Sequence, residues 1–430
     1  MSDRDSASVS VPRASAGARL EIRAARIPVD FFVIATIYLA AGMLAAPWLT
    51  PRLLEYFYQP AILALTHTFT IGWITAAIMG VLYRYAPALA HRPLPYPRLL
   101  MPQLVLFVIG SSGMITHFAL GSWSGVWSAA IVLIASVILF AANVIPCVWA
   151  EFGRGIAQTG ITMAIGFLFV AAVLGCLLAL DKSAGFMGGN LIDNLAAHAH
   201  LAALGWVGIT VCALSYRMLP AFAGVKAIAF DRRRWQVYAL GAAAILLAGA
   251  LLRGARTTFF PAVLAASVLG AYAISIVTMI PGRRPVPGWT LPHAAAGIAW
   301  MMIAAAMGLA LTIIGVNGAL GARIAIGYGV AGLLGWFGNF IIGMSYQLFP
   351  GAVIHARAAT RKTQITHAQI SRPGLNPTTF AGFNLGLALL VAGALASSDI
   401  LAITGASLTT LGALAYATRA LHSLSFAYRR

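Results

Sequence analysis

The sequence predicts an all-α integral membrane protein whose twelve transmembrane helices form three four-helix units with pseudo-threefold symmetry. Three observations support this prediction: an apolar composition, a one-sided distribution of positive charge, and an internal repeat. The 430-residue chain is 60% hydrophobic and only 9% charged, and its mean hydropathy is +0.88. A soluble globular domain carries far more charge, so the composition excludes that class and indicates a protein that crosses the membrane many times.

Apolar runs long enough to cross a bilayer occur twelve times along the chain. A transmembrane helix needs about 20 consecutive, mainly apolar residues, and the runs have roughly that length. The predicted spans are 30–49, 60–85, 99–119, 125–149, 159–180, 194–219, 236–253, 259–280, 291–315, 321–349, 378–397 and 400–424. Together they make residues 29–430 a single transmembrane domain.

The basic residues predict how the chain is oriented. With the N-terminus inside, all but five of the 28 Lys and Arg residues fall in the tail or in inner segments. Positive charge is retained on the cytoplasmic side, so both termini are expected in the cytoplasm and the protein in an inner (cytoplasmic) membrane of the bacterial type. The net charge of +18 then reflects basic loops, so the expected partner is the lipid bilayer and not nucleic acid. The five outer residues are Arg52, Lys182, Arg253, Arg256 and Arg323.

The N-terminal residues and the three cysteines suggest no catalytic chemistry. Residues 1–28 are rich in Ser, Ala and Arg and lack the apolar core of a signal peptide, which indicates a disordered, basic cytoplasmic tail. Cys147, Cys176 and Cys212 have no metal-binding spacing, and none begins a CxxCH heme-attachment motif. A cytochrome with covalently bound heme would therefore have to be a separate chain.

A repeated motif divides the chain into thirds. Trp206 is followed by Tyr216 and Pro220, ten and fourteen residues later, and this spacing occurs twice more, 133 residues earlier and 130 residues later. Such a period equals the length of four helices, so it predicts three four-helix units arranged in a ring. The other copies are Trp73, Tyr83 and Pro87, and Trp336, Tyr346 and Pro350; the Gly before each Trp is Gly72, Gly205 or Gly335, and a further Gly about 30 residues earlier is Gly42, Gly175 or Gly308.

Histidines mark the outer part of two of the three copies. His67 and His200 each lie six residues before the repeated Trp, so they are expected at the same depth. His198 is two residues from His200, which on an α-helix separates their directions by about 200°, so we expect that the two do not face one pocket. Tyr328 stands at the position of His198 in the third copy, and His117, near the outer end of the third helix, is expected to reach the same layer.

These residues are candidate ligands of a cofactor. An ionisable residue within a membrane span faces the bundle interior or a cavity, and imidazole is the usual axial ligand of heme iron and suits copper. We predict that His67, His198 and His200 bind a cofactor or metal, with His117 as a further metal ligand. The alternative is that they only form hydrogen bonds between helices. The repeated tryptophans are expected to be packing anchors, and the remaining histidines to lie near the inner interface: His91, His293, His355, His367 and His422.

With twelve helices, a threefold repeat and outer histidines on the second and sixth helices, the chain resembles subunit I of the heme–copper oxidase and nitric oxide reductase superfamily. The resemblance implies a low-spin heme ligand at His67 and a copper ligand at His200 or His198. The histidine pairs of that family on the seventh and tenth helices have no counterparts, since residues 236–253 and 321–349 contain no His. The His198-Ala-His200 segment is also similar to the histidine clusters of NnrS-type heme- and copper-containing membrane proteins, which are linked to nitric oxide stress.

The residues and the resemblance together predict a membrane protein that binds a b-type heme, with or without copper, and acts in electron transfer or in O2 or NO chemistry. A cytochrome or another redox protein is the expected electron donor. Proton pumping is not expected, because all ten acidic residues lie in the tail, in loops or near helix ends. Two alternatives stay open: a transporter or channel, which the repeat would suit, and a cofactor-free subunit that supports the assembly of a partner.

Overall fold

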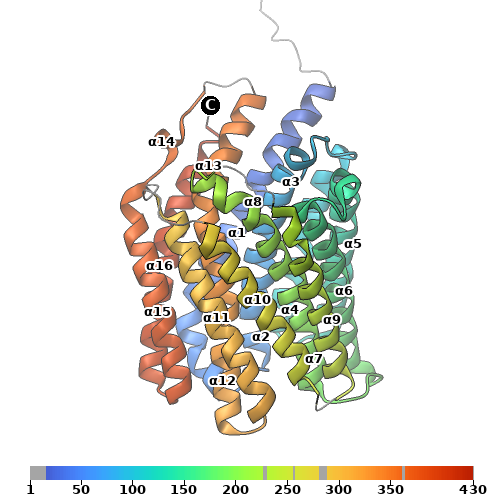
Figure 1. Cartoon of the computed structure of the whole chain (residues 1–430), viewed down its shortest axis with the longest axis vertical. Helices are drawn as coiled ribbons and strands as arrows, with labels where there is room; N and C mark the ends of the chain where they lie inside the picture. Colours follow the sequence, from blue (N-terminus) through green and yellow to red (C-terminus); the bar gives the residue numbers. More distant parts are fainter. Residues whose placement is uncertain (1–15, 226–229, 255–256, 280–287, 361–363, 430) are drawn as a thin grey trace, which may run out of the picture.

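The computed structural model describes residues 16–225, 230–254, 257–279, 288–360 and 364–429, and this part of the chain is almost entirely helical. Twelve helical segments are long and apolar enough to cross a membrane, which confirms the all-α membrane class and the number of predicted spans. The helices run side by side in one bundle, and the first and last described residues lie at the same end of it (Figure 1). We call this end the terminal end and the opposite one the distal end.

Nine of the twelve spans contain one long α-helix, and three are built of three consecutive segments. The nine helices are α1 (Ala16–Glu55), α4 (Leu100–Ala119), α5 (Trp123–Val148), α6 (Ile156–Ala184), α9 (Arg234–Leu252), α10 (Phe259–Met279), α11 (Thr290–Ile314), α15 (Asn376–Ala396) and α16 (Asp399–Ser425). The second span is α2 (Pro60–His67), η1 (Thr68–Thr75) and α3 (Ala76–Ala90); the sixth is α7 (Leu191–His200), η4 (Leu201–Gly208) and α8 (Ile209–Phe222); the tenth is α12 (Ala319–Val330), η6 (Ala331–Gly338) and α13 (Asn339–Ala359). The short elements are η2 (Pro97–Leu99), η3 (Trp149–Glu151), η5 (Phe230–Arg233), α14 (His367–Ile370) and η7 (Pro373–Leu375).

The first helix begins at Ala16, so the prediction of a disordered tail over residues 1–28 is wrong for residues 16–28; residues 1–15 lie outside the described part. The composition misled because Ala and Arg, which make up seven of the thirteen residues from 16 to 28, are strong helix formers. Packing also holds the extension in place. Ile27 is fully buried, and the guanidinium carbon of Arg26 lies 5.0 Å from the ring centroid of Tyr428.

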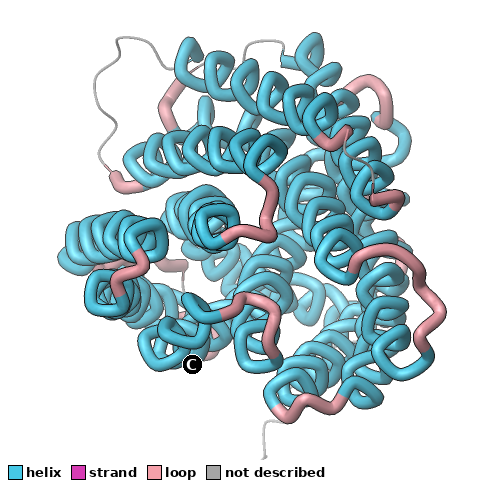
Figure 2. Tube along the Cα trace, turned by 90° about the horizontal axis from the view of Figure 1, so that it is seen from below, coloured by secondary structure: helices cyan, strands magenta, loops and turns pink. Residues whose placement is uncertain are grey.

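The helices pack in chain order and close into a ring of neighbours. At the boundaries between the predicted four-helix units, α5 packs against α6 and α10 against α11, and at the third boundary α16 packs against α1. The view along the bundle shows most of these helices end-on (Figure 2). In the centre, η6 contacts both η1 and η4. The middle segments of the three broken spans therefore meet in the interior, although they are far apart in the chain.

Each broken span changes from α-helix to π-helix for eight residues. The three π-helical segments begin at Thr68, Leu201 and Ala331, which are 133 and 130 residues apart, as the repeated tryptophans are. π-Helix is rare and usually limited to a single turn. The three π-helical segments therefore occupy equivalent positions in the three copies of the sequence repeat. The sequence pattern, interpreted with α-helical turns throughout, did not predict these π-helical segments.

The three repeated tryptophans are buried and reach across the centre of the bundle in a cyclic order. The Trp206 indole Nε1–H donates a hydrogen bond of 3.0 Å to the hydroxyl of Thr75, the last residue of η1. The other two indoles pack against the glycines that end the other π-helical segments: Trp336 against Gly208, and Trp73 against Gly338. Each indole thus contacts the same register position of a neighbouring span, which confirms the predicted role of the tryptophans as packing anchors.

Candidate functional site

A cavity of about 890 Å³ occupies the distal half of the bundle between the three broken spans. Its volume lies in the upper part of the roughly 300–1,000 Å³ range of small-molecule and cofactor sites. Most of its wall is apolar, and it extends to exposed polar residues in the distal loops, among them Asn190 and Asn317. The cavity therefore has room for a large, mainly apolar ligand that enters from the distal end.

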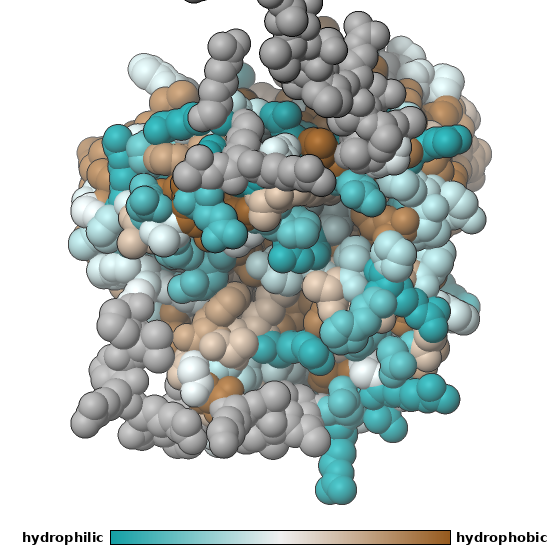
Figure 3. Space-filling model, turned by 90° about the horizontal axis from the view of Figure 1, so that it is seen from above, coloured by the Kyte–Doolittle hydropathy of each residue, from teal (hydrophilic) through white to brown (hydrophobic). Residues whose placement is uncertain are grey.

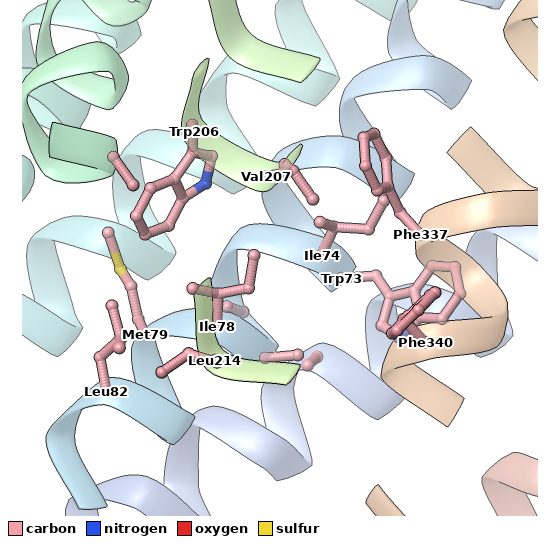
Figure 4. Close-up of a cluster of buried hydrophobic side chains, with 14 of the residues drawn as sticks. Trp73, Ile74, Ile78, Met79, Leu82, Trp206, Val207, Leu214, Phe337 and Phe340 are labelled. Carbon is pink, nitrogen blue, oxygen red and sulfur yellow. The ribbon is translucent and has the colours of Figure 1, made fainter. Parts of the chain in front are cut away.

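Ile74, Val207 and Phe337 form the floor of this cavity. Each follows the repeated Trp of its span, and the three side chains lie close together at the centre of the bundle (Figure 4). On the other side of this layer, a small cavity of about 60 Å³ is lined by residues of α3, α8 and α13, among them Ile78 and Leu214. The layer therefore closes the centre of the bundle between a large distal cavity and a small one nearer the terminal end.

His67 lines the cavity as the last residue of α2, directly before the π-helical segment. Its Nδ1 lies 2.8 Å from the carbonyl oxygen of Leu63. A carbonyl oxygen only accepts, so this contact fixes the proton on Nδ1. The ring also stacks on Phe118 of α4, with centroids 4.5 Å apart. These two contacts hold the imidazole in place and leave Nε2 unprotonated in the neutral ring.

His198 and His200 both line the same cavity, so the prediction that they do not face one pocket is wrong. Two side chains that point about 200° apart on a helix lie in different pockets only if each pocket is narrower than the helix. Here the cavity surrounds much of the circumference of α7 and the start of η4. The lining residues in this stretch include Leu195, Ala196, His198, Ala199, His200, Ala202 and Ala203.

The two imidazoles of α7 make different contacts. His198 Nδ1 lies 3.0 Å from the carbonyl oxygen of Ala171 on α6. His200 Nδ1 lies 2.7 Å from the carbonyl oxygen of Ala196, one turn earlier. The Nε2 atom of His200 lies 3.0 Å from the hydroxyl oxygen of Tyr328 on α12 and accepts a hydrogen bond from it. His200 therefore has both ring nitrogens engaged.

Tyr328 is the residue whose role the sequence analysis missed. It matches His198 in register, and both rings pack against a glycine of the preceding span, at Gly308 and Gly175 respectively. The register match was the only signal in the sequence. The hydrogen bond to His200 joins residues 128 positions apart and shows that Tyr328 belongs to the wall of the site.

The three cavity imidazoles share one hydrogen-bond arrangement. In each, Nδ1 donates to a backbone carbonyl, so the neutral ring carries its lone pair on Nε2. The same arrangement is typical of metal-binding histidines, because the hydrogen bond fixes the tautomer and raises the basicity of the ligating nitrogen. The Nε2 atoms of His67 and His198 make no hydrogen bond within the described part of the chain. Both nitrogens are therefore available to a ligand in the cavity.

The structure does not bring His117 to this cavity, although the sequence suggested that it would reach the same layer. His117 is not part of the cavity wall; it packs against Gly125, and its buried Nδ1 has no hydrogen-bond partner among the described residues. Nor do the described residues contain a group of three His, Cys, Asp or Glu side chains that could hold a metal ion. His67, His198 and His200 therefore do not converge on a single metal position.

This donor set fits a heme better than a copper ion. Protein copper sites use several ligands on one ion, whereas heme iron needs one axial imidazole and a pocket of controlled polarity around the macrocycle. His67 and His198 each present one such nitrogen to an apolar cavity large enough for a macrocycle.

Asp193, an acidic residue expected near a helix end, also lines the cavity.

Of the remaining histidines, His293 lies in the first turn of α11, at the end of the bundle where it was expected, but its side chain is inside the bundle and not at its surface. It is fully buried, and its Nδ1 lies 2.8 Å from Asn339 Oδ1 on α13. The burial results from a close approach of α13, since a Cβ on Gly343 would lie 2.7 Å from His293 Cβ. This close approach of α13 buries the first turn of α11. The other four have exposed or half-buried side chains, as expected: His91, His355, His367 and His422.

The fold and the cavity define a class: a multi-pass α-helical membrane protein with a large histidine-bearing cavity at one end of its helix bundle. No protein-family model matches the chain, and no curated protein matches it either. The geometry of the distal cavity is therefore the basis on which a function is inferred.

Proposed function

We propose that the protein is a membrane heme protein that acts in electron transfer or in O2 or NO chemistry, with a b-type heme in the distal cavity and His67 as its axial ligand. The observation that carries the proposal is the pair of imidazoles of His67 and His198. Each is held at Nδ1 by a backbone carbonyl, and each lines the same apolar cavity. Noncovalent binding follows from the absence of a CxxCH motif in the sequence.

His67 is preferred to His198 because its ring is fixed by two contacts, the Leu63 carbonyl and the stacked ring of Phe118. His198 lines the same cavity from a different span. It is therefore the second candidate ligand. The donor set supports a copper ion less than a heme, because His200 already accepts a hydrogen bond from the Tyr328 hydroxyl at Nε2.

A bound heme would supply one-electron redox chemistry and an iron that binds O2 or NO. The chain itself would hold Nε2 of His67 unprotonated and fixed in direction, and its apolar wall would exclude water. Tyr328 and His200 would supply a preformed hydrogen-bonding pair on the wall that the tenth span contributes. The distribution of acidic residues supports a protein without proton pumping, since relays through membranes usually need intramembrane carboxylates.

The proposal includes the arrangement of the chain in the membrane. Three observations support three four-helix units with pseudo-threefold symmetry: the common register of the π-helical segments, the repeated order of helix packing, and the cyclic packing of the tryptophans. Many hydrophilic residues gather on the terminal end (Figure 3). The excess of Lys and Arg in the segments at that end favours the cytoplasmic side. The cavity would then open on the outer side of an inner (cytoplasmic) membrane, where a cytochrome or another redox protein would deliver electrons.

Absorption spectra of the full-length protein test the proposal. Protein expressed with ample heme and copper should show a Soret band, with α and β bands after reduction by dithionite. His67→Ala should remove or shift the Soret band, whereas His422→Ala, a half-buried histidine at the terminal end, should leave it unchanged. A preparation with neither a Soret band nor bound metal would contradict the proposal.

A transporter is the second candidate, and one observation favours it. The layer of Ile74, Val207 and Phe337 lies between the distal cavity and the small cavity, and a movement of these side chains could connect the two cavities. Flux of a small molecule into liposomes by heme-free protein would support this candidate. Wild-type protein that carries heme and shows no flux would exclude it.

A further inference from the structure

Unpartnered polar atoms are concentrated at the terminal end of the last four spans, away from the distal cavity. Ten buried side-chain nitrogen or oxygen atoms lack a hydrogen-bond partner among the described residues. Such atoms are rare in native proteins, and each requires an explanation. Six of the ten fall on four neighbouring helices, which points to one shared cause. They are Thr290 Oγ1 and His293 Nε2 on α11, Tyr346 OH on α13, Asn376 Oδ1 on α15, and Arg419 Nε and Ser423 Oγ on α16.

Arg419 is the charged centre of this group. Its side chain is only 3% exposed, and its guanidinium carbon lies 4.0 Å from the ring centroid of Tyr346. The described residues that lie close enough to influence its charge are Tyr346, Tyr416 and His293, and none of these is an Asp or Glu. Burial of an unpaired charge is costly, and one cation–π contact offsets only part of that cost. The described side chains therefore do not balance the charge of Arg419.

Tyr346, whose ring lies next to this guanidinium, connects it to His293 and to α15. The rings of His293 and Tyr346 have centroids 5.8 Å apart, and the Tyr346 hydroxyl lies near Thr379, one turn from Asn376, but outside hydrogen-bond geometry. His293 Nδ1 donates to Asn339 Oδ1, which leaves Nε2 as an acceptor. The group thus offers donors at Arg419 and Tyr346 and an acceptor at His293. A matching ligand carries both anionic oxygens and a hydroxyl group.

The first two copies of the repeat contain no such open group at the corresponding tyrosine. There the tyrosine hydroxyl donates to a glutamine, and the glutamine amide donates to a serine on the next helix. These chains are Tyr83, Gln103 and Ser136, and Tyr216, Gln236 and Ser275. The protein therefore satisfies this position by itself in two copies. The second copy also has a cation over its tyrosine ring, but Arg233 is half-buried there and lies 5.9 Å from the Tyr216 centroid. In the third copy the cation, Arg419, is buried, and the Tyr346 hydroxyl has no partner among the described residues.

We propose that the terminal ends of α11, α13, α15 and α16 bind an oxyanion that also carries a hydroxyl group, with a phosphate as the simplest case. The anionic oxygens accept from Arg419 and Tyr346, and the hydroxyl donates to His293 Nε2. Such a group can come from free phosphate or from the headgroup of an anionic lipid such as phosphatidylglycerol. Ser423 and Thr290 add two hydroxyls to the site.

Thermal unfolding of the full-length protein in phosphatidylcholine nanodiscs tests the proposal and separates the two sources. Inorganic phosphate is added to phosphate-free buffer in one arm, with sodium chloride at equal ionic strength as the reference. Phosphatidylglycerol replaces part of the lipid in the other arm. A site for free phosphate raises the midpoint by at least about 2 °C in the first arm, and a lipid site does so only in the second.

Arg419→Gln should abolish the response or raise the half-saturating concentration at least tenfold. The loss of one hydrogen bond to a charged group weakens binding by roughly this factor. Arg217→Gln is the matched control, because it removes an exposed arginine from the terminal part of α8 and should keep the response. Tyr346→Phe keeps the ring beneath Arg419 and removes one hydrogen-bond donor. This variant tests the same response if Arg419→Gln does not fold. A wild-type protein that responds in neither arm, or variants at both positions that respond as the wild type does, would overturn the proposal.

Discussion

The first eight spans and the last four share the register of their central segments but place their polar chemistry at opposite ends of the bundle. In the first eight, His67, His198 and His200 line the distal cavity, and the tyrosines at the terminal end are satisfied within the protein. In the last four, a tyrosine replaces the histidine at the distal end, and the buried cation lies at the terminal end. The difference indicates that the common register of the central segments sets their depth and packing, whereas a few side chains in each copy set the local chemistry.

The last four spans also contain the closest helix pair, and the largest expected effect comes from breaking it. A Cβ built on Gly405 of α16 would lie 2.2 Å from the backbone nitrogen of Leu390 on α15 and 2.7 Å from the carbonyl oxygen of Gly386. Backbone atoms cannot yield unless the two helices separate. Gly405→Ala should therefore lower the free energy of unfolding by about 3 kcal/mol, measured by denaturant unfolding followed by circular dichroism.

Gly249→Ala on α9 is the matched control from the earlier spans. Nothing lies within 4 Å of a Cβ at this position, and alanine is the better helix former by about 1 kcal/mol. The variant should be as stable as the wild type or slightly more stable. Equal losses at Gly405 and Gly249 would show that α15 and α16 are not held by backbone contact.

The second largest effect is expected at Asn339, which joins the polar groups of α11, α13 and α15. Its Oδ1 accepts from His293 Nδ1 at 2.8 Å, and its Nδ2 donates to Asn384 Oδ1 at 2.9 Å. Asn339→Leu would leave Nδ1 of the buried His293 without its acceptor and would remove one of the contacts of the half-buried Asn384, at a cost of about 2 to 3 kcal/mol in unfolding free energy. Ile209→Leu, at the same register in the second copy, keeps its volume and should cost less than about 1.5 kcal/mol. The opposite order of stabilities would show that the amide network does not support the last four spans.

The periodic part of this architecture could be predicted from the sequence, and the contacts between distant segments could not. Hydropathy and the repeat identified twelve spans and the common depth of His67 and His200, because both depend on residues close in the chain. The π-helical turns were missed because helical periodicity was assumed to be 3.6 residues per turn throughout. The hydrogen bond between His200 and Tyr328 and the burial of His293 depend on how spans approach one another. A hydropathy pattern does not report that approach.

Two tryptophans in the same register should respond differently to one substitution. Trp206 Nε1 donates to the Thr75 hydroxyl at 3.0 Å, whereas Trp336 Nε1 has no hydrogen-bond partner among the described residues. Trp→Phe removes the same volume at both positions, so the difference between the two variants isolates the hydrogen bond. Trp206→Phe should cost about 1 kcal/mol more than Trp336→Phe, as measured by thermal and denaturant unfolding. Equal costs would show that the packing of the indole rings alone holds the centre together.

The smallest effect is expected where the third copy contributes to the distal cavity. Tyr328→Phe removes the hydroxyl that donates to His200 Nε2 and keeps the ring against Gly308. The loss of one partly buried hydrogen bond should lower the free energy of unfolding by about 1 kcal/mol. Under the proposed function the heme content should stay near that of the wild type, because the ligand nitrogens of His67 and His198 are untouched. The absorption spectrum of the NO-bound, reduced protein should shift, since the released His200 nitrogen changes the polarity of the wall. A loss of heme in Tyr328→Phe would instead show that the third copy holds the cofactor through Tyr328, and the contrast between the first eight spans and the last four would then no longer describe the distal cavity.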